Sequence, residues 1–375
     1  MSFQRRPGFF DVDERAAKLT EMGDPLVGLN AVIDWEAFRP DLNRVHEKER
    51  KSHAGAKPFD VVLMFKLLIL QQLHNLSDDG IEYQGRDRLS FMRFLGLQLE
   101  DRVPDAKTVW LYREQLKALN LIDVLFSRFY EQLAAQGYVA RAGQMIDASF
   151  VEVPRQRDSR EENAKIKAGE IPEGWDDAEA KAKRSQKDTD ARWTKKNDET
   201  HYGYKNHINA DQEHKLIQDY EVTHAAVHDS RVFEDLLDQT VDDNGDKRPV
   251  YADSAYRSKE HEEALADAEI ESHVCEKGAR GCPLSEEQKQ SNRRKSKVRA
   301  RVEHIFGAQQ AMGGHLVRTI GLARAKVKIG LMNRTGRSPA LMRYRMNLVY
   351  NMRRLVQLLK RDAATLARTL SAAHG

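Results

Sequence analysis

The feature that most constrains this chain of 375 residues is a short apolar stretch that contains an acid. Residues 143–153 (GQMIDASFVEV) are rich in apolar and β-branched side chains, begin with a glycine and end before Pro154. This pattern predicts a buried β-strand. Asp147 lies within it, and a carboxylate there is costly unless a cation pairs with it or it holds a metal. The strand therefore predicts a cation beside Asp147.

Two later stretches contain further acids in similar surroundings. Residues 249–257 (PVYADSAYR) indicate a second short buried strand, which ends at Asp253. Residues 298–306 (VRARVEHIF) have apolar side chains at helical spacing, with Glu303 among them. Two acids on strands and one on a helix are the hard oxygen ligands that a two-metal phosphoryl-transfer site needs.

Two histidine-containing motifs lie between the strand acids, at residues 201–207 (HYGYKNH) and 223–230 (THAAVHDS). Together with the three acidic stretches, they resemble the DDE transposases of bacterial insertion sequences, specifically the insertion-sequence-five family. The resemblance covers most of the chain. It implies a ribonuclease H-like catalytic domain in which Asp147, Asp253 and Glu303 are the catalytic and metal-binding triad.

The resemblance also implies an activity on DNA. The triad is expected to hold two Mg²⁺ ions, for which Mn²⁺ can substitute, to cut DNA at the element ends and to join the 3′-OH ends to target DNA. A homodimer or larger homo-oligomer on double-stranded DNA is expected, because there are two ends. Two alternatives stay open: a ribonuclease H-like nuclease without strand transfer, and a catalytically silent DNA-binding protein descended from a transposase.

The charge distribution favours a polyanionic partner, although the formal net charge is only +3. Residues 289–301 contain seven Lys or Arg, residues 304–361 contain twelve, and neither segment contains an acid. Basic residues beside an acidic metal site suit an enzyme that acts on nucleic acid, because they attract phosphates. A solvated basic face is the alternative. The DNA contacts expected near the triad are Lys297, Arg299, Arg301 and Arg257.

The fold class expected is α/β, with an all-α DNA-binding region before the catalytic domain. Residues 1–58 are expected to form an N-terminal extension and residues 59–138 a helical domain around a buried helix at 59–76. Further helices are expected over 77–95, from the Asp105 cap to about residue 117, and over 121–136.

The turn before the Asp105 cap is compatible with a helix-turn-helix, although any helical bundle has such turns. Lys107, Thr108 and Arg113 are therefore candidate DNA contacts. The resemblance strengthens this interpretation, since the family's N-terminal helices are taken to bind the element ends.

The catalytic domain is expected over residues 139–320, as a mixed five-stranded sheet with flanking helices. Its five strands are expected in the order of a ribonuclease H-like sheet, at 143–153, 202–209, 216–227, 249–253 and 271–277. Helices are expected after the third strand and over 257–272, and a loop over 278–297.

Residues 155–200 are expected to form a charged insertion, a long loop or a partly ordered arm, because they lack an apolar period. Trp193 stands among basic residues there, which suits stacking on a base or contact with phosphate; pinning the arm to the core is an equal alternative. Lys205 and His207 share one face of the second strand and are further candidates, although a hydrogen-bonded histidine is the commoner case.

The C-terminal residues 321–375 are expected to form basic helices interrupted by an insertion. Residues 334–347 (RTGRSPALMRYRMN) stand where relatives continue directly, and a Met-Asn dipeptide occurs on both sides. Gly336 and Pro339 would break a helix, so a basic loop or kink is expected. Ser296 and Gln310 replace a tyrosine and a basic residue of related branches, which weakens the inference of DNA-backbone contacts there.

The sequence argues against membrane-bound and disulfide-rich classes of protein. It has no run of about 18 apolar residues and no secretory signal at its start, so a cytoplasmic protein associated with the nucleoid is expected. Cys275 and Cys282 are its only cysteines, too few for a disulfide framework and weak evidence for zinc.

Overall fold

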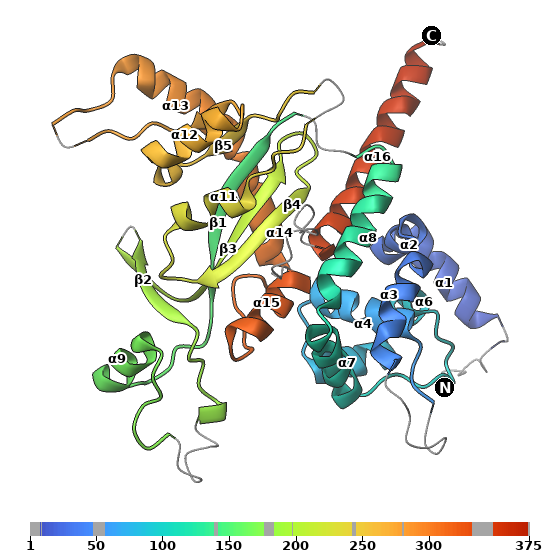
Figure 1. Cartoon of the computed structure of the whole chain (residues 1–375). Helices are drawn as coiled ribbons and strands as arrows, with labels where there is room; N and C mark the ends of the chain where they lie inside the picture. Colours follow the sequence, from blue (N-terminus) through green and yellow to red (C-terminus); the bar gives the residue numbers. More distant parts are fainter. Residues whose placement is uncertain are drawn as a thin grey trace, which may run out of the picture. The chain divides into compact units, whose positions relative to one another are not determined.

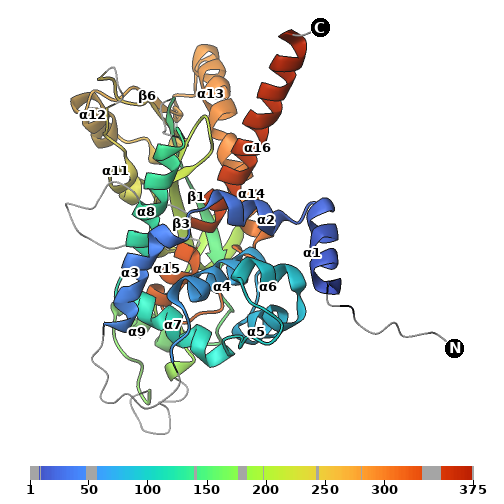
Figure 2. The same cartoon turned by 90° about the vertical axis from the view of Figure 1, so that its right-hand side faces the viewer.

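The computed structural model describes residues 8, 10–47, 57–138, 142–175, 184–196, 198–241, 245–279, 281–331 and 348–373. The chain divides into two compact units, Met1–Gln132 with Met352–Gly375, and Leu133–Asn351. Figures 1 and 2 show that the first unit is helical and that the second contains the sheet. Within the described residues, no helix is long and apolar enough to cross a membrane.

The first unit is built around α4 (Val61–Leu73), the buried helix that the sequence predicts. Ten of its thirteen residues are buried, and Asp60 caps it by accepting hydrogen bonds from the backbone N–H groups of Val62 and Leu63. The other elements of this unit are α1 (Asp11–Glu21), α2 (Pro25–Val32), η1 (Glu36–Phe38), α3 (Arg39–Asn43), η2 (Arg44–His46), α5 (Asp78–Asp87), α6 (Leu89–Leu95), α7 (Ala106–Ala118), most of α8 (Leu121–Ala135) and most of α16 (Leu348–Ala373).

The prediction of a single helix over residues 77–95 is wrong, because the helix is broken in its middle. The chain forms α5 and α6 there, separated by Arg88, whose backbone is extended at φ −93° and ψ 113°. Gly85 and Asp87, just before the break, have low helix propensity. Both expected ends are confirmed: Ser77 caps α5, and Gly96 ends α6 in the left-handed region at φ 77°.

The second unit contains a mixed sheet of six strands, in the order β2-β3-β1-β5-β6, with β4 also paired to β3. Antiparallel pairs join β3 to β1, β2 and β4, whereas β1, β5 and β6 run parallel. The five expected strands are all present, and their order is that of a ribonuclease H-like sheet. The strands are β1 (Gln144–Glu152), β2 (Arg192–Lys196), β3 (Glu199–Asp211), β4 (Ile217–His224), β5 (Val250–Ala252) and β6 (Ser272–Val274).

Two segments that the sequence analysis treats as loops contain regular structure, and the expected count of five strands is wrong. The charged insertion contributes α9 (Arg160–Ala168) and the sixth strand, β2. The expected loop before residue 298 contains α13 (Glu286–Arg299). Both helices begin with a capping box, in which a serine and the residue three positions later exchange hydrogen bonds with the backbone.

Helices cover both faces of the sheet (Figure 1). On one face, Ile146 of β1 packs into an apolar core with α11 (Phe233–Leu236), α12 (Lys259–Asp267) and the turns η3 (Asp229–Val232) and η4 (Ser254–Tyr256). On the other face lies α14 (Arg301–Ala311), whose Gln309 accepts a hydrogen bond from Asn206 of β3 at 3.3 Å. Successive side chains of a strand point to opposite faces, so Asp147, next to Ile146, points toward the α14 side.

The predicted insertion at residues 334–347 lies outside the described residues. Before it, α15 (Leu322–Leu331) packs beside β4, where Lys326 forms an ion pair with Glu221 at 3.2 Å. After it, α16 begins at Leu348, and its Asn351 bonds both backbone groups of Ile217.

Candidate active site

Two of the three predicted acids are brought together by the register of the sheet. In the parallel pair β1 and β5, Ile146 lies beside Ala252. The next residue on each strand is an acid, Asp147 and Asp253. They therefore lie at neighbouring positions, where β5 ends. Asp253 also begins the turn η4, because its side chain accepts a hydrogen bond from the backbone N–H of Ser254 at 2.6 Å.

Asp147 is buried and has two hydrogen-bond donors. Its exposed fraction is 9%. One carboxylate oxygen accepts from the backbone N–H of Ala148 at 2.8 Å, and the other from Nη1 of Arg299 at 2.6 Å. Burial raises the pKa of Asp147, Arg299 opposes this rise, and the negative charge of Glu303 adds to it. The cation that the sequence predicts beside Asp147 is thus provided in this structure by Arg299.

Arg299 ends α13 and contacts Asp147. Burial acts to lower its pKa, but the charges of Asp147 and Asp253 outweigh burial and raise the pKa. Its Nε group is buried and has no hydrogen-bond partner. Arg299 therefore has unused donor capacity beside two acids.

Glu303 reaches the same region from the first turn of α14. A break at Ala300 separates α13 from α14, so Arg299 and Glu303 stand on successive helices. The buried side chains of Val302, Ile305 and Phe306 anchor α14, whereas Glu303 is exposed. Its negative charge makes a small contribution to the raised pKa of Asp147.

The donor set fits a divalent metal ion by its chemistry. Carboxylate oxygens are the ligands that Mg²⁺ and Mn²⁺ prefer, and a buried acid such as Asp147 needs a positive charge. In the described part of the chain, no three His, Cys, Asp or Glu side chains are close enough together to hold an ion. Metal binding would therefore require the carboxylates to rearrange. We expect this rearrangement to begin at the contact between Asp147 and Arg299.

Two predicted DNA contacts have to be corrected, because Lys205 and His207 are buried within the sheet unit. Lys205 donates to the backbone oxygen of Val227 at 2.7 Å and to Asp229 at 2.8 Å. His207 is fully buried, bonds Thr223 at 2.9 Å, and has its pKa lowered by burial to about 4. The shared face that alternation predicts is correct, but it points into the interior, and both residues have structural contacts there.

Three of the basic residues expected near the triad are exposed. Lys297 lies on α13; Arg301 and Arg257 each donate to a backbone carbonyl, of Gln212 at 3.2 Å and of Val274 at 3.3 Å. Trp193 is 37% exposed, packs on Tyr202, and has the guanidinium of Arg155 over its ring at 5.7 Å. These side chains remain accessible to a ligand.

In the helical unit, the three candidate residues differ. Lys107 is exposed, and Thr108 is partly buried at the start of α7. Arg113 forms an ion pair with Asp78 at 2.8 Å and is mostly buried. Arg113 therefore joins α7 to α5, which is a structural contact that its sequence pattern did not reveal.

Two further polar groups of the sheet unit, Tyr256 and Asp229, were not predicted as site residues. The hydroxyl of Tyr256 is buried without a partner, and burial raises its pKa well above the usual value, with smaller effects of Asp147, Asp229 and Asp253. Asp229 begins the turn after β4, much as Asp253 follows β5. An acid shortly after a predicted strand is the signal that could have identified Asp229.

Two family models match the sequence. A model described as a transposase DDE domain matches residues 140–334, just over half of the chain, and this range includes all three acids and Arg299. A model described as a transposase domain (DUF772) matches residues 14–115, which lie in the helical unit. No solved structure matches the chain.

Proposed function

Because this chain belongs to the transposases with a DDE domain, which cut and join DNA and depend on divalent metal ions, we propose that it acts on its own insertion sequence. It binds the terminal inverted repeats of an element of the insertion-sequence-five family, cuts DNA there and joins the ends to target DNA. The observation that carries this proposal is the register of β1 and β5, which sets Asp147 beside Asp253. Arg299 and Glu303 complete the group.

We assign the catalytic role to Asp147, Asp253 and Glu303. Their carboxylates would hold two Mg²⁺ or Mn²⁺ ions, whose chemistry is to activate a water molecule and to stabilise the leaving oxygen of a phosphodiester. Asp147 and Asp253 stand on a rigid sheet, which fixes their positions, and the exposed Glu303 closes the site from α14. The freed 3′-OH would then take the place of water and attack a phosphodiester of target DNA, forming a new P–O bond while the 3′ oxygen of the target strand leaves, so that one site performs hydrolysis and strand transfer in turn.

Arg299 acts as a positioning residue in this scheme. Its guanidinium favours the charged form of the buried carboxylate of Asp147 through the 2.6 Å hydrogen bond, against the larger effect of burial. A guanidinium also suits the phosphate groups of DNA. Arg299 would therefore release Asp147 and bind a phosphate oxygen instead when substrate and metal arrive.

The DNA partner would lie along the exposed basic residues beside the triad. No side chain of α13 is buried, and its exposed basic residues include Arg293, Arg294 and Lys297. We assign end recognition to residues 59–138, catalysis to 139–320 and further phosphate contacts to 321–375. Because the reaction takes place at two ends, the active species is a homodimer or a larger assembly on DNA.

The test uses a labelled duplex that carries the DNA flanking the gene, incubated with the protein and Mg²⁺. The wild type is expected to cut the strand at the element end and to give joined products, and Asp253→Asn to give neither. Asp267→Asn is the matched control, because Asp267 is an exposed aspartate at the end of α12.

Three other results would reject the proposal in different ways. Cutting without joining or end preference would indicate a nuclease. Binding of the duplex without cutting by the wild type would indicate a silent DNA-binding protein. Equal cutting by the wild type and Asp253→Asn, with both proteins folded by circular dichroism, would remove Asp253 from the site.

A further inference from the structure

Helix α14 carries Glu303, and the buried stripe of this helix contains one polar side chain. The stripe follows the spacing i, i+3, i+4 and i+7, and its members are Val302, Ile305, Phe306 and Gln309. This spacing places the four residues on one face of the helix, the face that packs on the sheet. Gln309 is only 5% exposed. A glutamine at such a position loses its contacts with water and needs a polar partner.

The polar partner of Gln309 is Asn206 on β3. Nδ2 of Asn206 donates a hydrogen bond to Oε1 of Gln309 at 3.3 Å, and Asn206 is 2% exposed. In the antiparallel pair of β1 and β3, Asn206 lies opposite Ser149, which is two residues from Asp147. Side chains two positions apart on a strand share a face, so Asn206 and Asp147 lie on the same side of the sheet. The amide pair therefore ties α14 to the sheet next to the candidate active site.

Contacts with β1 flank α14 at both ends. Before the helix starts, Arg299 bonds Asp147 at 2.6 Å. After it ends, the backbone of Glu152 donates to the carbonyl of His315 and accepts from the N–H of Val317, both at 2.8 Å. Metal binding is expected to open the first of these contacts. The position of α14 on the sheet then depends on contacts further along the chain.

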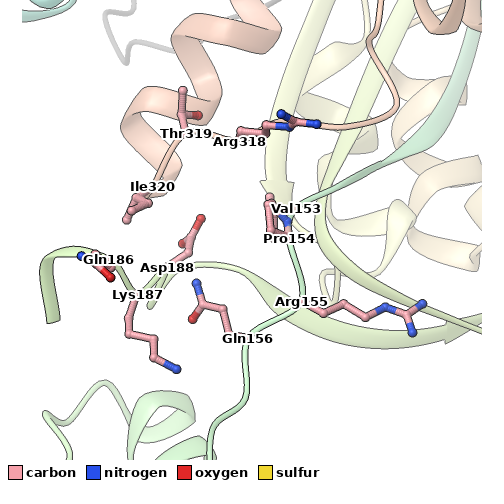
Figure 3. A pocket seen from close by; sticks show the side chains of 10 residues that line it. All are labelled: Val153, Pro154, Arg155, Gln156, Gln186, Lys187, Asp188, Arg318, Thr319 and Ile320. Carbon is pink, nitrogen blue, oxygen red and sulfur yellow. The ribbon is translucent and has the colours of Figure 1, made fainter. Parts of the chain in front are cut away.

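The contact at the far end of α14 leaves unfilled space beside it. Residues 318–320 line a cavity of about 350 Å³ together with residues 153–156 and 186–188 (Figure 3). Because side chains do not fill this space, they do not prevent small movements of the segment that follows α14. Both side chains of the Asn206–Gln309 pair, in contrast, are buried. We therefore expect this pair to be the fixed point of α14.

An amide pair within an apolar stripe fixes the register of two elements more than it adds stability. A single buried polar position specifies register in paired helices at a cost in stability, because its hydrogen bond exists in one register only. Nε2 of Gln309 is buried and has no hydrogen-bond partner among the described residues, which lowers the contribution of the pair to stability. A slide of α14 by one residue would move Glu303 by about 1.5 Å, whereas the groups of a site have to be held within about 0.5 Å.

We propose that Asn206 and Gln309 are positioning residues, which hold α14 at the height where Glu303 can share a metal ion with Asp147. This role rests on the proposed function, because it concerns the metal site of the triad. The hydrogen bond keeps α14 in place on β3 while Arg299 releases Asp147. Neither amide touches the metal or DNA in this role, so removing the pair is expected to weaken metal binding without abolishing the chemistry.

The first measurement is urea unfolding of the full chain at increasing Mg²⁺ concentration, without DNA. The double variant Asn206→Leu with Gln309→Met replaces both amides by apolar groups of similar shape, so its stability in EDTA is expected to equal or exceed that of the wild type. The Mg²⁺ concentration that gives half of the stabilisation is expected to rise roughly tenfold, as is typical for residues that orient metal ligands. The single variant Gln309→Met is expected to show the same rise.

Ile305→Val is the matched control, because it removes one methylene group from the same stripe of α14. It is expected to lower the stability in EDTA and to leave the response to Mg²⁺ unchanged. A general loosening of α14 would shift the Mg²⁺ response of this variant as well. The control therefore separates the register of the helix from its packing.

The second measurement follows cutting of the labelled end duplex at increasing Mg²⁺ concentration. Gln309→Met is expected to need roughly tenfold more Mg²⁺ for its half-maximal rate and to keep a maximal rate within about twofold of the wild type. Asp253→Asn is expected not to recover at any Mg²⁺ concentration. A residue that merely stabilises the fold would not give this separation between metal requirement and maximal rate.

The role of the pair is refuted if Gln309→Met and the double variant respond to Mg²⁺ as the wild type does, or if Ile305→Val shifts the response equally. A fall in the maximal rate with an unchanged Mg²⁺ requirement would also refute it. These results would leave the proposed function intact. If the wild type itself gains no stability from Mg²⁺, the metal site of the proposed function fails together with the role of the pair.

Discussion

At the scale of single residues, Arg299 provides positive charge beside the acids of the candidate active site. Its guanidinium is within 2.6 Å of a buried carboxylate and close enough to Asp253 for that charge to raise its own pKa. The charge of this acidic cluster is therefore partly balanced by the chain itself. The sequence indicates that Asp147 needs a cation, but it does not identify one 152 positions away.

Arg299→Gln is expected to lower the free energy of unfolding by about 3 kcal/mol in the presence of EDTA, because it leaves the buried Asp147 without its partner. Mg²⁺ is expected to recover part of this loss, since a bound ion supplies the missing charge and stabilises the folded state. Urea unfolding with and without Mg²⁺ measures both effects. Arg301→Gln, an exposed neighbour, is the control; equal stability of Arg299→Gln and wild type would contradict the role given to Arg299.

His207 gives the fold a dependence on pH. Its pKa is lowered from 6.5 to about 4 by burial, partly opposed by Asp229 and reinforced by Lys205. Between these two values the unfolded chain binds more protons at this position than the folded chain. Stability is therefore complete above pH 6.5 and is lost as the pH falls toward 4, by up to about 3 kcal/mol.

In His207→Gln this contribution is absent, so the difference in unfolding free energy between pH 7 and pH 5 is expected to be smaller than in the wild type. Urea titrations at both values measure that difference. His315→Gln, at an exposed histidine, is the matched control and is expected to leave the pH dependence unchanged. An unchanged slope in His207→Gln would show that the pKa of His207 is the same in the folded and the unfolded chain.

At the scale of elements, α13 is a helix held by its caps and its C-terminal end rather than by a buried stripe. It has no buried residue, its capping box is formed by Ser285 and Gln288, and Asn292 bonds the backbone of Glu276 at 2.8 and 3.0 Å. A helix in this position needs no apolar period, so a search for periodicity overlooks it. Its exposed basic side chains are available to DNA.

Arg294→Gln is expected to weaken binding of any duplex to a similar extent, whatever its sequence, and to reduce the slope of log affinity against log salt concentration by about one. Fluorescence anisotropy over a series of salt concentrations measures this slope. Lys259→Gln on α12 removes a comparable exposed charge and is expected to leave the slope unchanged. Loss of affinity for one sequence alone would mean that Arg294 reads bases.

The elements that the sequence predicts correctly are those whose apolar pattern also marks the side chains that pack in the core. The strands β1 and β5 and the helix α4 have buried side chains, and each is present. The missed elements α9, β2 and α13 are polar. The two helices have a local signal, a serine followed three positions later by Glu162 or Gln288. The contact of Arg299 with Asp147 could not be predicted, because the two residues are 152 positions apart and no local rule pairs residues at that separation.

At the scale of the whole molecule, the two compact units match two separate transposase models, one in the helical unit and one over the sheet unit. This division suits a protein in which one part binds specific DNA and another carries out chemistry. In the proposed function, each chain contains one triad and therefore one site. A reaction at two ends is then expected to use two chains.

Mixing experiments test this stoichiometry. When wild type and Asp253→Asn are mixed in equal amounts before DNA is added, cutting at single ends is expected to fall to about half. Products with both ends joined are expected to fall to about one quarter, because both subunits of a pair must be active. Gel analysis of the labelled duplex measures both products in one reaction, and a mixture with Asp267→Asn is expected to change neither. If joined products fall only to about half, a single subunit processes both ends, and the assembly has to serve DNA binding rather than supply a second site.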